Sequence, residues 1–230
     1  MRICYIISTC NKYLDTRVAY QMETMLKNIS KNDIYYLTSA PCIEKRQFGW
    51  NTMDDGKNIT WKYIHFIYNM KDEFLNYDWF IFIDDDTFVF PGRLEKYLSS
   101  FDSNKCYYIG HELDHIKDNY CEYMSGGAGY AISNELYKNI YNYVQKNGIN
   151  CSFKHWCDDL CIGLWIQEIA KTTEVMQINN KNFHIKMNKN ADIFSTALTF
   201  HELRESADYE YYMGIKIDNG YFIKRGTTFA

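Results

Sequence analysis

The strongest constraint on this chain is a short apolar stretch that ends abruptly in three acids. Residues 80–83 are apolar without polar alternation, which is typical of a strand buried on both faces. Asp84, Asp85 and Asp86 follow directly, at the strand end where open α/β sheets bind ligands. Adjacent acids there repel one another and are costly to desolvate, and a divalent cation relieves both effects. Because carboxylate oxygens suit Mg²⁺ or Mn²⁺, we interpret the acids as a metal site. The alternative is a solvated acidic turn.

Length and composition favour one domain over residues 1–230 and exclude some partners. The chain is 47% hydrophobic and 17% aromatic, which is enough for a sizeable core. Its net charge of −4 and its pI of about 5.9 argue against a nucleic-acid partner, which would need a broad basic face. None of the 8 cysteines has CxxC spacing, so zinc is weakly supported and we interpret most of them as buried thiols.

The beginning of the chain resembles a strand more than a leader segment. Residues 1–7 lack the long apolar region and the cleavage site of a signal peptide. A run of 18 apolar residues occurs nowhere, so we expect no membrane span. If the chain is complete, we expect a cytoplasmic protein. If it is a piece of a longer protein, the lumen of the secretory pathway is the expected location.

The first half predicts alternating strands and helices. Strands over residues 2–8 and 34–37 and helices over 16–29 and 65–75 precede the central strand. This βαβαβ order predicts a mostly parallel, Rossmann-like α/β sheet with helices on both faces. The start of the first helix would lie near the acids and suits a diphosphate. Arg17 in its first turn is either a phosphate or nucleotide ligand or part of a surface salt bridge. Further predicted elements are an irregular segment over 41–60, helices over 91–101 and 133–144, a strand over 106–109 and a helix that begins at 157.

Three later features add candidate functional residues. Residues 126–129 contain three glycines, which let a ligand or another strand approach the backbone, unless they only form a turn or bulge. Asp158 and Asp159 begin a helix, where capping accounts for one acid and we interpret the other as functional. Trp156 just before them either stacks on a sugar or packs. His201 follows an apolar stretch and is either structural or a metal ligand.

Together these motifs resemble the Fringe-type β-1,3-glycosyltransferases, most nearly the core 1 β-1,3-galactosyltransferase branch. The resemblance covers about residues 1–205 and rests on four motifs in order: 78–80 with 84–89, 123–130, Asp158-Asp159 with Gly163, and Phe200-His201. It implies a GT-A fold, a UDP-sugar donor, Mn²⁺ with Mg²⁺ as the alternative, inversion at the sugar C1, and a glycan or glycoprotein acceptor. It further divides the chain into a nucleotide-binding half over 1–90, an acceptor and catalytic half over 91–205, and an extension over 206–230.

The resemblance also implies a role for each motif residue. Asp84, Asp86 and His201 would hold the metal. Asp159 would be the catalytic base, with Asp158 as the second choice. The residues expected to contact the donor nucleotide or its sugar are Thr9, Arg17, Thr38, Asp84, Asp85, Gly126 and Gly127.

Two other classes of function compete with a sugar transferase. Haloacid-dehalogenase-type phosphatases carry DxDx[TV] after a strand, but Phe88 stands at the fifth position here and two strands precede the motif. A carbohydrate- or cation-binding module without catalytic activity would keep the same fold, and UDP binding without turnover would distinguish it.

Overall fold

The computed structural model describes most of the chain. The described residues are 1–39, 42, 46–48, 59–69, 73–113, 122–147, 158–188, 190–205, 207–209, 215–218, 221–224 and 227–228. Trp156 and most of the predicted irregular segment over 41–60 lie outside them. Among the described cysteines, Cys4, Cys106 and Cys161 are buried thiols, as predicted, whereas Cys10 and Cys42 are partly exposed.

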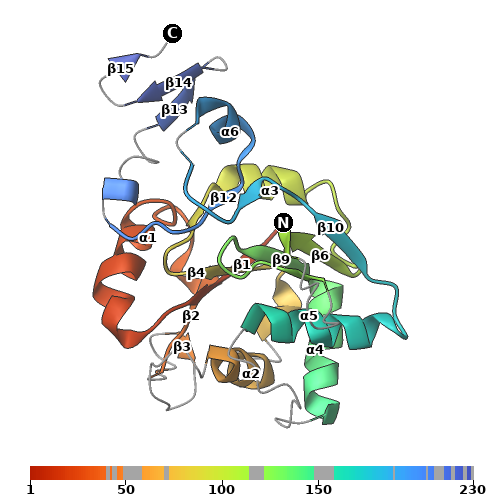
Figure 1. The fold of residues 1–230 in the computed structure, drawn as a ribbon. Coiled ribbons are helices and arrows are strands. Elements are labelled where there is room, and N and C mark those ends of the chain that lie inside the picture. Colours follow the sequence, from red (N-terminus) through yellow and green to blue (C-terminus); the bar gives the residue numbers. More distant parts are fainter. Residues whose placement is uncertain are drawn as a thin grey trace.

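A seven-stranded sheet forms the centre of the molecule, with strand order β10-β6-β9-β4-β1-β2-β3 (Figure 1). β9 is antiparallel to both of its neighbours, and the remaining pairs are parallel, so the predicted mostly parallel α/β sheet is confirmed. The strands are β1 (Ile3–Ser8), β2 (Ile34–Leu37), β3 (Gln47–Phe48), β4 (Trp79–Asp84), β6 (Tyr107–Gly110), β9 (Tyr130–Ser133) and β10 (Met176–Asn179).

The central strand β4 is buried on both faces, as its sequence predicted. It pairs with β1 on one side and with β9 on the other. Alternate side chains enter two different cores because successive residues of a strand point to opposite faces. Phe80 and Phe82 pack in the core beneath α2, α4 and α5, which we call the α5-side core. Ile81 and Ile83 pack in the other, the α3-side core.

Helices cover both faces of the sheet, as predicted (Figure 1). Helix α2 begins before its predicted range and ends earlier, because a 3-10 turn at Glu73–Asn76 replaces its predicted end. The predicted helix over 16–29 is regular only in α1: a π-helical turn (Leu14–Val18) precedes it, and Thr24 has a non-helical ψ of −97°. The helices are α1 (Ala19–Glu23), α2 (Ile59–Asn69), α3 (Pro91–Leu98), α4 (Asn134–Asn147), α5 (Asp158–Ala170) and α6 (Ala191–Thr196).

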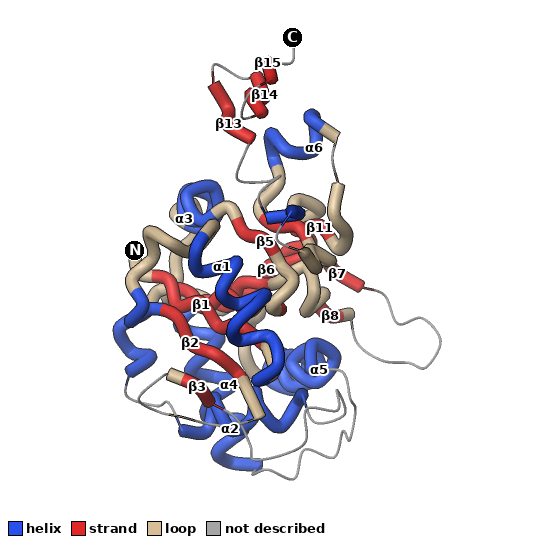
Figure 2. The backbone as a smooth tube through the Cα atoms, turned by 90° about the vertical axis from the view of Figure 1, so that its left-hand side faces the viewer, coloured by secondary structure: helices blue, strands red, loops and turns tan. Residues whose placement is uncertain are grey.

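Short strands outside the main sheet connect distant parts of the sequence (Figure 2). A small sheet joins β12 (Thr199–Phe200) to β5 (Phe88–Val89) and β11 (Phe183–His184), and the sequence did not predict it. It places the residue after β12 against the turn that precedes β5. A pair of short strands, β7 (Glu112–Leu113) and β8 (Tyr123–Met124), leads into the glycine-rich segment.

The C-terminal residues form a separate antiparallel sheet. Its strands are β13 (Ile215–Asp218), β14 (Tyr221–Lys224) and β15 (Thr227–Thr228). Across the described residues, every helix is too short or too polar to cross a bilayer.

Candidate functional site

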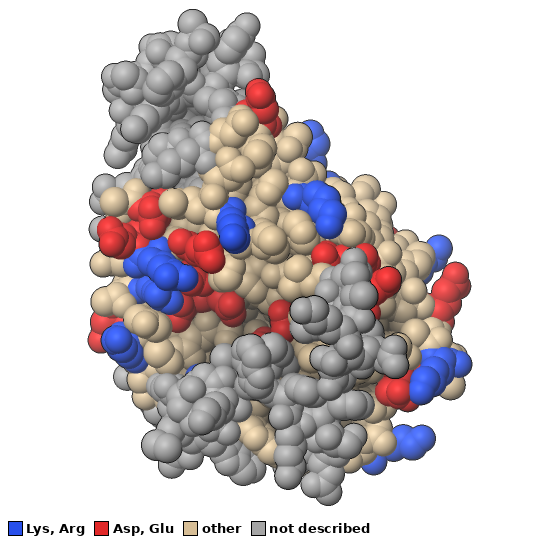
Figure 3. Space-filling model, in the orientation of Figure 1, with Lys and Arg blue, Asp and Glu red and all other residues tan. Residues whose placement is uncertain are grey.

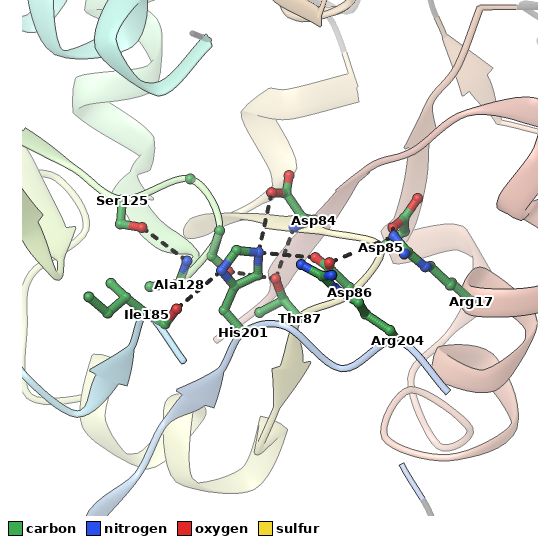
Figure 4. Close-up of polar contacts among 12 residues, drawn as sticks. Arg17, Asp84, Asp85, Asp86, Thr87, Ser125, Ala128, Ile185, His201 and Arg204 are labelled. Carbon is green, nitrogen blue, oxygen red and sulfur yellow. Dashed lines mark hydrogen bonds and ion pairs between the residues drawn. The ribbon is translucent and has the colours of Figure 1, made fainter. Parts of the chain in front are cut away.

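The three acids after β4 point in different directions. Asp84 continues the alternation of Phe82 toward the α5-side core, whereas Asp85 follows Ile83 to the opposite face. The carboxylate of Asp85 accepts a hydrogen bond from the Thr9 hydroxyl at 2.8 Å. It accepts another from Arg17 Nη1 at 2.9 Å (Figure 4). Asp85 is thereby turned into the protein, and its carboxylate braces the loop after β1.

Backbone and side-chain hydrogen bonds fix the turn that carries these acids. The Thr87 hydroxyl accepts from the Asp84 N–H at 3.2 Å and donates to the carbonyl of Gly127 at 2.7 Å. The buried Gln21 amide donates to the carbonyls of Asp84 and Thr87, at 3.0 and 2.9 Å. The sequence did not single out Thr87 or Gln21. Their contacts connect the acidic turn with the glycine-rich segment and with α1.

His201 completes a cluster that suits a metal ion (Figure 4). Its Nε2 lies 3.1 Å from Asp86 Oδ1 and 4.0 Å from Asp84 Oδ2. The candidate ligand atoms of the three residues lie within 4.8 Å of one another. Nδ1 of His201 is 3.3 Å from the carbonyl of Ile185, so this nitrogen donates and leaves Nε2 facing the acids. The sequence predicted these three ligands, and the fold brings them together from two distant segments.

The electrostatics of the cluster differ between its two acids. Burial and the neighbouring charges of Asp158 and Asp86 raise the pKa of Asp84 well above its usual range. Burial also acts to raise the pKa of Asp86, but the hydrogen bond and charge of His201 outweigh it and lower that pKa. Burial acts to lower the pKa of His201, and Asp86 more than offsets this and raises it. Asp86 and His201 therefore each favour the charged form of the other.

Gly127 packs directly beneath the imidazole of His201. A Cβ atom added to Gly127 would lie 2.2 Å from His201 Cε1, closer than any real contact. The absent side chain therefore leaves room for the histidine ring, a neighbour that the sequence did not indicate. Gly129 closes the segment with a φ of 80°, a left-handed conformation that favours glycine.

The two acids at the start of α5 have different surroundings. Asp159 accepts from the Gly126 N–H at 2.9 Å and from the Leu160 N–H at 2.8 Å. Asp158 is hydrogen bonded to Tyr63, and its Oδ2 is buried without a partner among the described residues. Burial and the charge of Asp159 raise the pKa of Asp158 to about 7. Asp159 thus holds the glycine-rich segment, and Asp158 faces the interior.

Comparison with known proteins identifies the family. A sequence profile described as Fringe-like matches residues 2–211. The chain belongs to the Fringe-like family. The match confirms the resemblance carried by the sequence motifs, and with the observed sheet it supports the predicted GT-A-type α/β fold.

The Fringe-like chain is also similar to named glycosyltransferases. It is 31% identical over 123 residues to glycoprotein-N-acetylgalactosamine 3-beta-galactosyltransferase 1 of Xenopus laevis. This match covers 52% of the chain and 32% of the relative, so the aligned part spans about a third of that protein.

Solved glycosyltransferase structures resemble the Fringe-like chain more distantly. One, involved in glycosylation of the major capsid of PBCV-1, has a TM-score of 0.49 and 12% identity, and covers 91% of this chain and 98% of its own. GlyE of Streptococcus pneumoniae TIGR4 has a TM-score of 0.43 and 14% identity, with coverages of 87% and 55%. Because both TM-scores are below 0.5, the fold assignment rests on the strand order and the family match.

Of the other residues predicted to contact the nucleotide, two lie beside the acidic cluster of the Fringe-like chain and one does not. Arg17 lies between Asp85 and Asp86, and its guanidinium packs over the ring of Tyr13 at 4.1 Å. Thr9 is engaged by Asp85. Thr38 is fully buried beside β3, where its N–H donates to the carbonyl of Phe48 at 2.7 Å. Arg17 and Thr9 therefore join the acidic cluster, and Thr38 does not.

Two basic residues near the cluster were missed in the sequence. The N–H of Leu203 donates to the carbonyl of Asp86 at 2.9 Å, and Glu202 adopts a left-handed φ of 68°. This turn places Arg204 beside Asp86 (Figure 4), where its charge helps to lower the pKa of that carboxyl. Lys62 is buried and donates to the carbonyl of Thr9 at 2.9 Å. Neither lies in a sequence motif, so only the fold reveals them.

Proposed function

We propose that this protein is a metal-dependent, inverting glycosyltransferase that moves a sugar from a UDP-sugar to an acceptor hydroxyl. The observation that carries the proposal is that a metal-type cluster and a candidate base lie on either side of the glycine-rich segment. Asp84, Asp86 and His201 form a metal-type cluster, and Gly126–Gly127 connects this cluster to Asp159. Membership of the Fringe-like family and the similarity to a named galactosyltransferase support the same reaction. They also favour transfer over the phosphatase alternative.

The ligand set fits Mn²⁺ best, with Mg²⁺ as the alternative. Two carboxylates suit either ion, and one imidazole favours Mn²⁺. The Ile185 carbonyl orients the imidazole, and Gly127 supports its face. A bound dication would supply Lewis-acid stabilisation of the departing diphosphate. Arg17 and Arg204, which flank Asp86, add positive charge on the same side.

Asp159 is the proposed general base. Its two backbone N–H partners favour the ionised form and fix its orientation. In the reaction, the acceptor oxygen forms a bond to the sugar C1 while the bond from C1 to the phosphate oxygen breaks. The electron pair leaves with UDP, and the acceptor proton passes to Asp159. General-base assistance of this kind contributes about 10²–10⁴-fold.

The charge distribution argues against a nucleic-acid partner. On the described part of the face in Figure 3, red and blue side chains lie close together, without a broad blue area. The net charge of −4 likewise argues against a polyanionic partner. A nucleic-acid partner is therefore not part of the proposal.

The test is UDP release from a panel of UDP-sugars, with Mn²⁺ and with EDTA. We expect at least one donor to be hydrolysed slowly, because water substitutes for the acceptor, and we expect EDTA to stop the reaction. UDP binding by calorimetry is measured in parallel. Binding without turnover of any donor would instead support a non-catalytic module, and full activity in EDTA would reject the metal.

A further inference from the structure

Four polar residues gather at the ends of β6 and β10, outside the cluster described above. We call this group, His111, Glu112, Asn179 and Lys181, the polar edge. Nε2 of His111 lies 3.5 Å from the ammonium of Lys181. The side chains of Asn179 and Glu112 lie 3.4 Å apart, and the N–H of Glu112 donates to Asn179 Oδ1 at 3.3 Å. All of these contacts are solvent-exposed.

The sheet places the polar edge beside the acidic cluster. β4 and β6 are both antiparallel to β9, which lies between them, and β10 is parallel to β6. The three strands β4, β6 and β10 therefore run in the same direction, and their carboxyl ends share one edge of the sheet. Phe82 and Gly110 both pair with Tyr130 of the intervening strand β9. His111 is therefore about 10 Å along the sheet edge from the acids that follow β4.

Asp159 lies between the two groups. Its carboxylate accepts a hydrogen bond from the N–H of Gly126 at 2.9 Å, in the glycine-rich segment that leads into β9. The next residue back, Ser125, donates its N–H to the carbonyl of His111 at 2.8 Å. A short continuous path of backbone thus joins the proposed base to the polar edge. Leu113 packs against a small cluster formed by Tyr123 and by Leu160 and Leu164 of α5, which holds this path against the helix.

The geometry of an inverting reaction indicates which substrate this edge faces. The attacking hydroxyl must approach C1 on the side opposite the leaving group. The leaving diphosphate belongs to the side of Asp86 and His201, and the base that receives the proton is Asp159. The acceptor therefore enters from beyond Asp159, where the polar edge begins. We propose that the polar edge binds the acceptor; this inference rests on the proposed transferase function.

The residues of the edge fit a neutral, hydroxyl-rich acceptor, that is, a glycan. Nδ1 of His111 is 2.7 Å from the carbonyl of Phe183, so this nitrogen donates and Nε2 is left as an acceptor. Lys181 donates only, Glu112 accepts only, and the amide of Asn179 does both. Sugar hydroxyls also donate and accept, and the opposite charges of Lys181 and Glu112 cancel. An anionic or cationic acceptor would meet one of them unfavourably.

The experiment separates acceptor binding from donor chemistry. UDP release from the best donor is measured with and without a panel of p-nitrophenyl α- and β-glycosides of galactose, N-acetylgalactosamine, glucose and N-acetylglucosamine. The variants are Lys181→Ala and Asn179→Ala. The matched control is Lys171→Ala, which removes an exposed lysine paired with Glu168 at the end of α5, away from the edge.

The expected result is a rise of about tenfold in the acceptor KM for each edge variant, because each loses one or two hydrogen bonds. Release of UDP in water should stay within about twofold, and Lys171→Ala should match the wild type. Unchanged acceptor KM values in both edge variants would overturn the inference while leaving the transferase intact. The inference would also be overturned if the enzyme hydrolyses the donor but none of the glycosides accelerates UDP release. Absence of donor hydrolysis in the wild type would instead be a failure of the proposed function.

Discussion

The site contains two pairs of adjacent acids, Asp85-Asp86 and Asp158-Asp159, and each pair turns one carboxylate toward the candidate site and one into the protein. In the turn after β4, Asp86 faces His201 and Asp85 faces inward. At the start of α5, Asp159 holds the glycine-rich segment and Asp158 faces inward. The two acids of each pair separate for different reasons. In the turn, hydrogen bonds from Thr9 and Arg17 hold Asp85 inward. In α5, successive residues are about 100° apart around the helix axis.

The inward acids differ in what neutralises them. Burial raises the pKa of Asp85, and hydrogen bonds from Arg17 and Thr9 offset part of that rise. Burial also raises the pKa of Asp158, and its hydrogen bond from Tyr63 brings no positive charge. Asp85 is thus part of an ion pair that braces the loop after β1. Asp158 is a carboxyl that keeps its proton up to about neutral pH. The comparison predicts different consequences for each of the four acids.

The largest effect is expected for the outward acid of the first pair. Asp86→Ala should reduce transfer by about 10³-fold or more, because the metal supplies several kcal/mol of charge stabilisation. His201→Ala should weaken the binding of both Mn²⁺ and UDP, as measured by calorimetry. Asp85→Asn is the matched variant within the pair, and it should lower thermal stability before it lowers metal affinity. Equal loss of Mn²⁺ affinity in Asp85→Asn would show that the inward placement is wrong.

The second comparison separates Asp159 from Asp158. Asp159→Asn keeps the shape of the side chain but does not accept a proton, so transfer should fall about 10²-fold or more with near-native binding of Mn²⁺ and UDP-sugar. Asp158→Asn should cost much less in rate. Calorimetric titration of UDP and transfer kinetics are measured on both. A dead Asp158→Asn enzyme beside an active Asp159→Asn enzyme would assign the base to the other acid.

Gly127 tests whether the glycine-rich segment acts through the histidine. Gly127→Ala should displace the imidazole of His201 and weaken Mn²⁺ affinity about 10–100-fold, the range seen when groups that orient metal ligands are removed. Gly92→Ala is the control, since an added Cβ there meets nothing within 4 Å. Metal titrations and melting curves are recorded together. A fall in melting temperature with native Mn²⁺ affinity would assign Gly127 a purely structural role.

Local patterns in the sequence predicted much of this arrangement. The unbroken apolar run before Asp84 predicted the doubly buried strand, and the alternation of strands and helices predicted the parallel sheet. The four motifs predicted the family and the ligands Asp84, Asp86 and His201, which the fold brings together.

Features that depend on tertiary contacts were not predicted. The strands β5 and β12 have two residues each, so no periodicity marks the small sheet that delivers His201. The inward turn of Asp85 depends on Arg17 and Thr9, which are 68 and 76 residues away in the chain. Arg204 reaches Asp86 through a backbone turn at Glu202 that requires a left-handed φ. The sequence left open whether the missing side chain of Gly127 makes room for a ligand or only forms a turn, because a sequence does not show that the ring of His201 packs there.

The last expected effect is on stability instead of activity: a pH dependence of the unfolding free energy that comes from Asp158. Its pKa is about 7 in the folded protein and about 4 in an unfolded chain, so between these values the folded state binds more protons. Its contribution to the unfolding free energy therefore falls as pH rises from about 4 to 7, by at most about 1.4 kcal/mol per pH unit, and levels off above 7. Asp158→Asn removes this term, so the variant should gain stability relative to the wild type as pH rises through that window. Urea unfolding at pH 5, 6, 7 and 8 measures the difference.

Asp102→Asn is a control of opposite sign, because hydrogen bonds from Asn104 lower the pKa of Asp102 and its contribution is lost only as pH falls. A constant difference between Asp158→Asn and the wild type across these pH values would mean that Asp158 is ionised throughout, like an acid with a cation beside it, and the contrast with Asp85 would disappear.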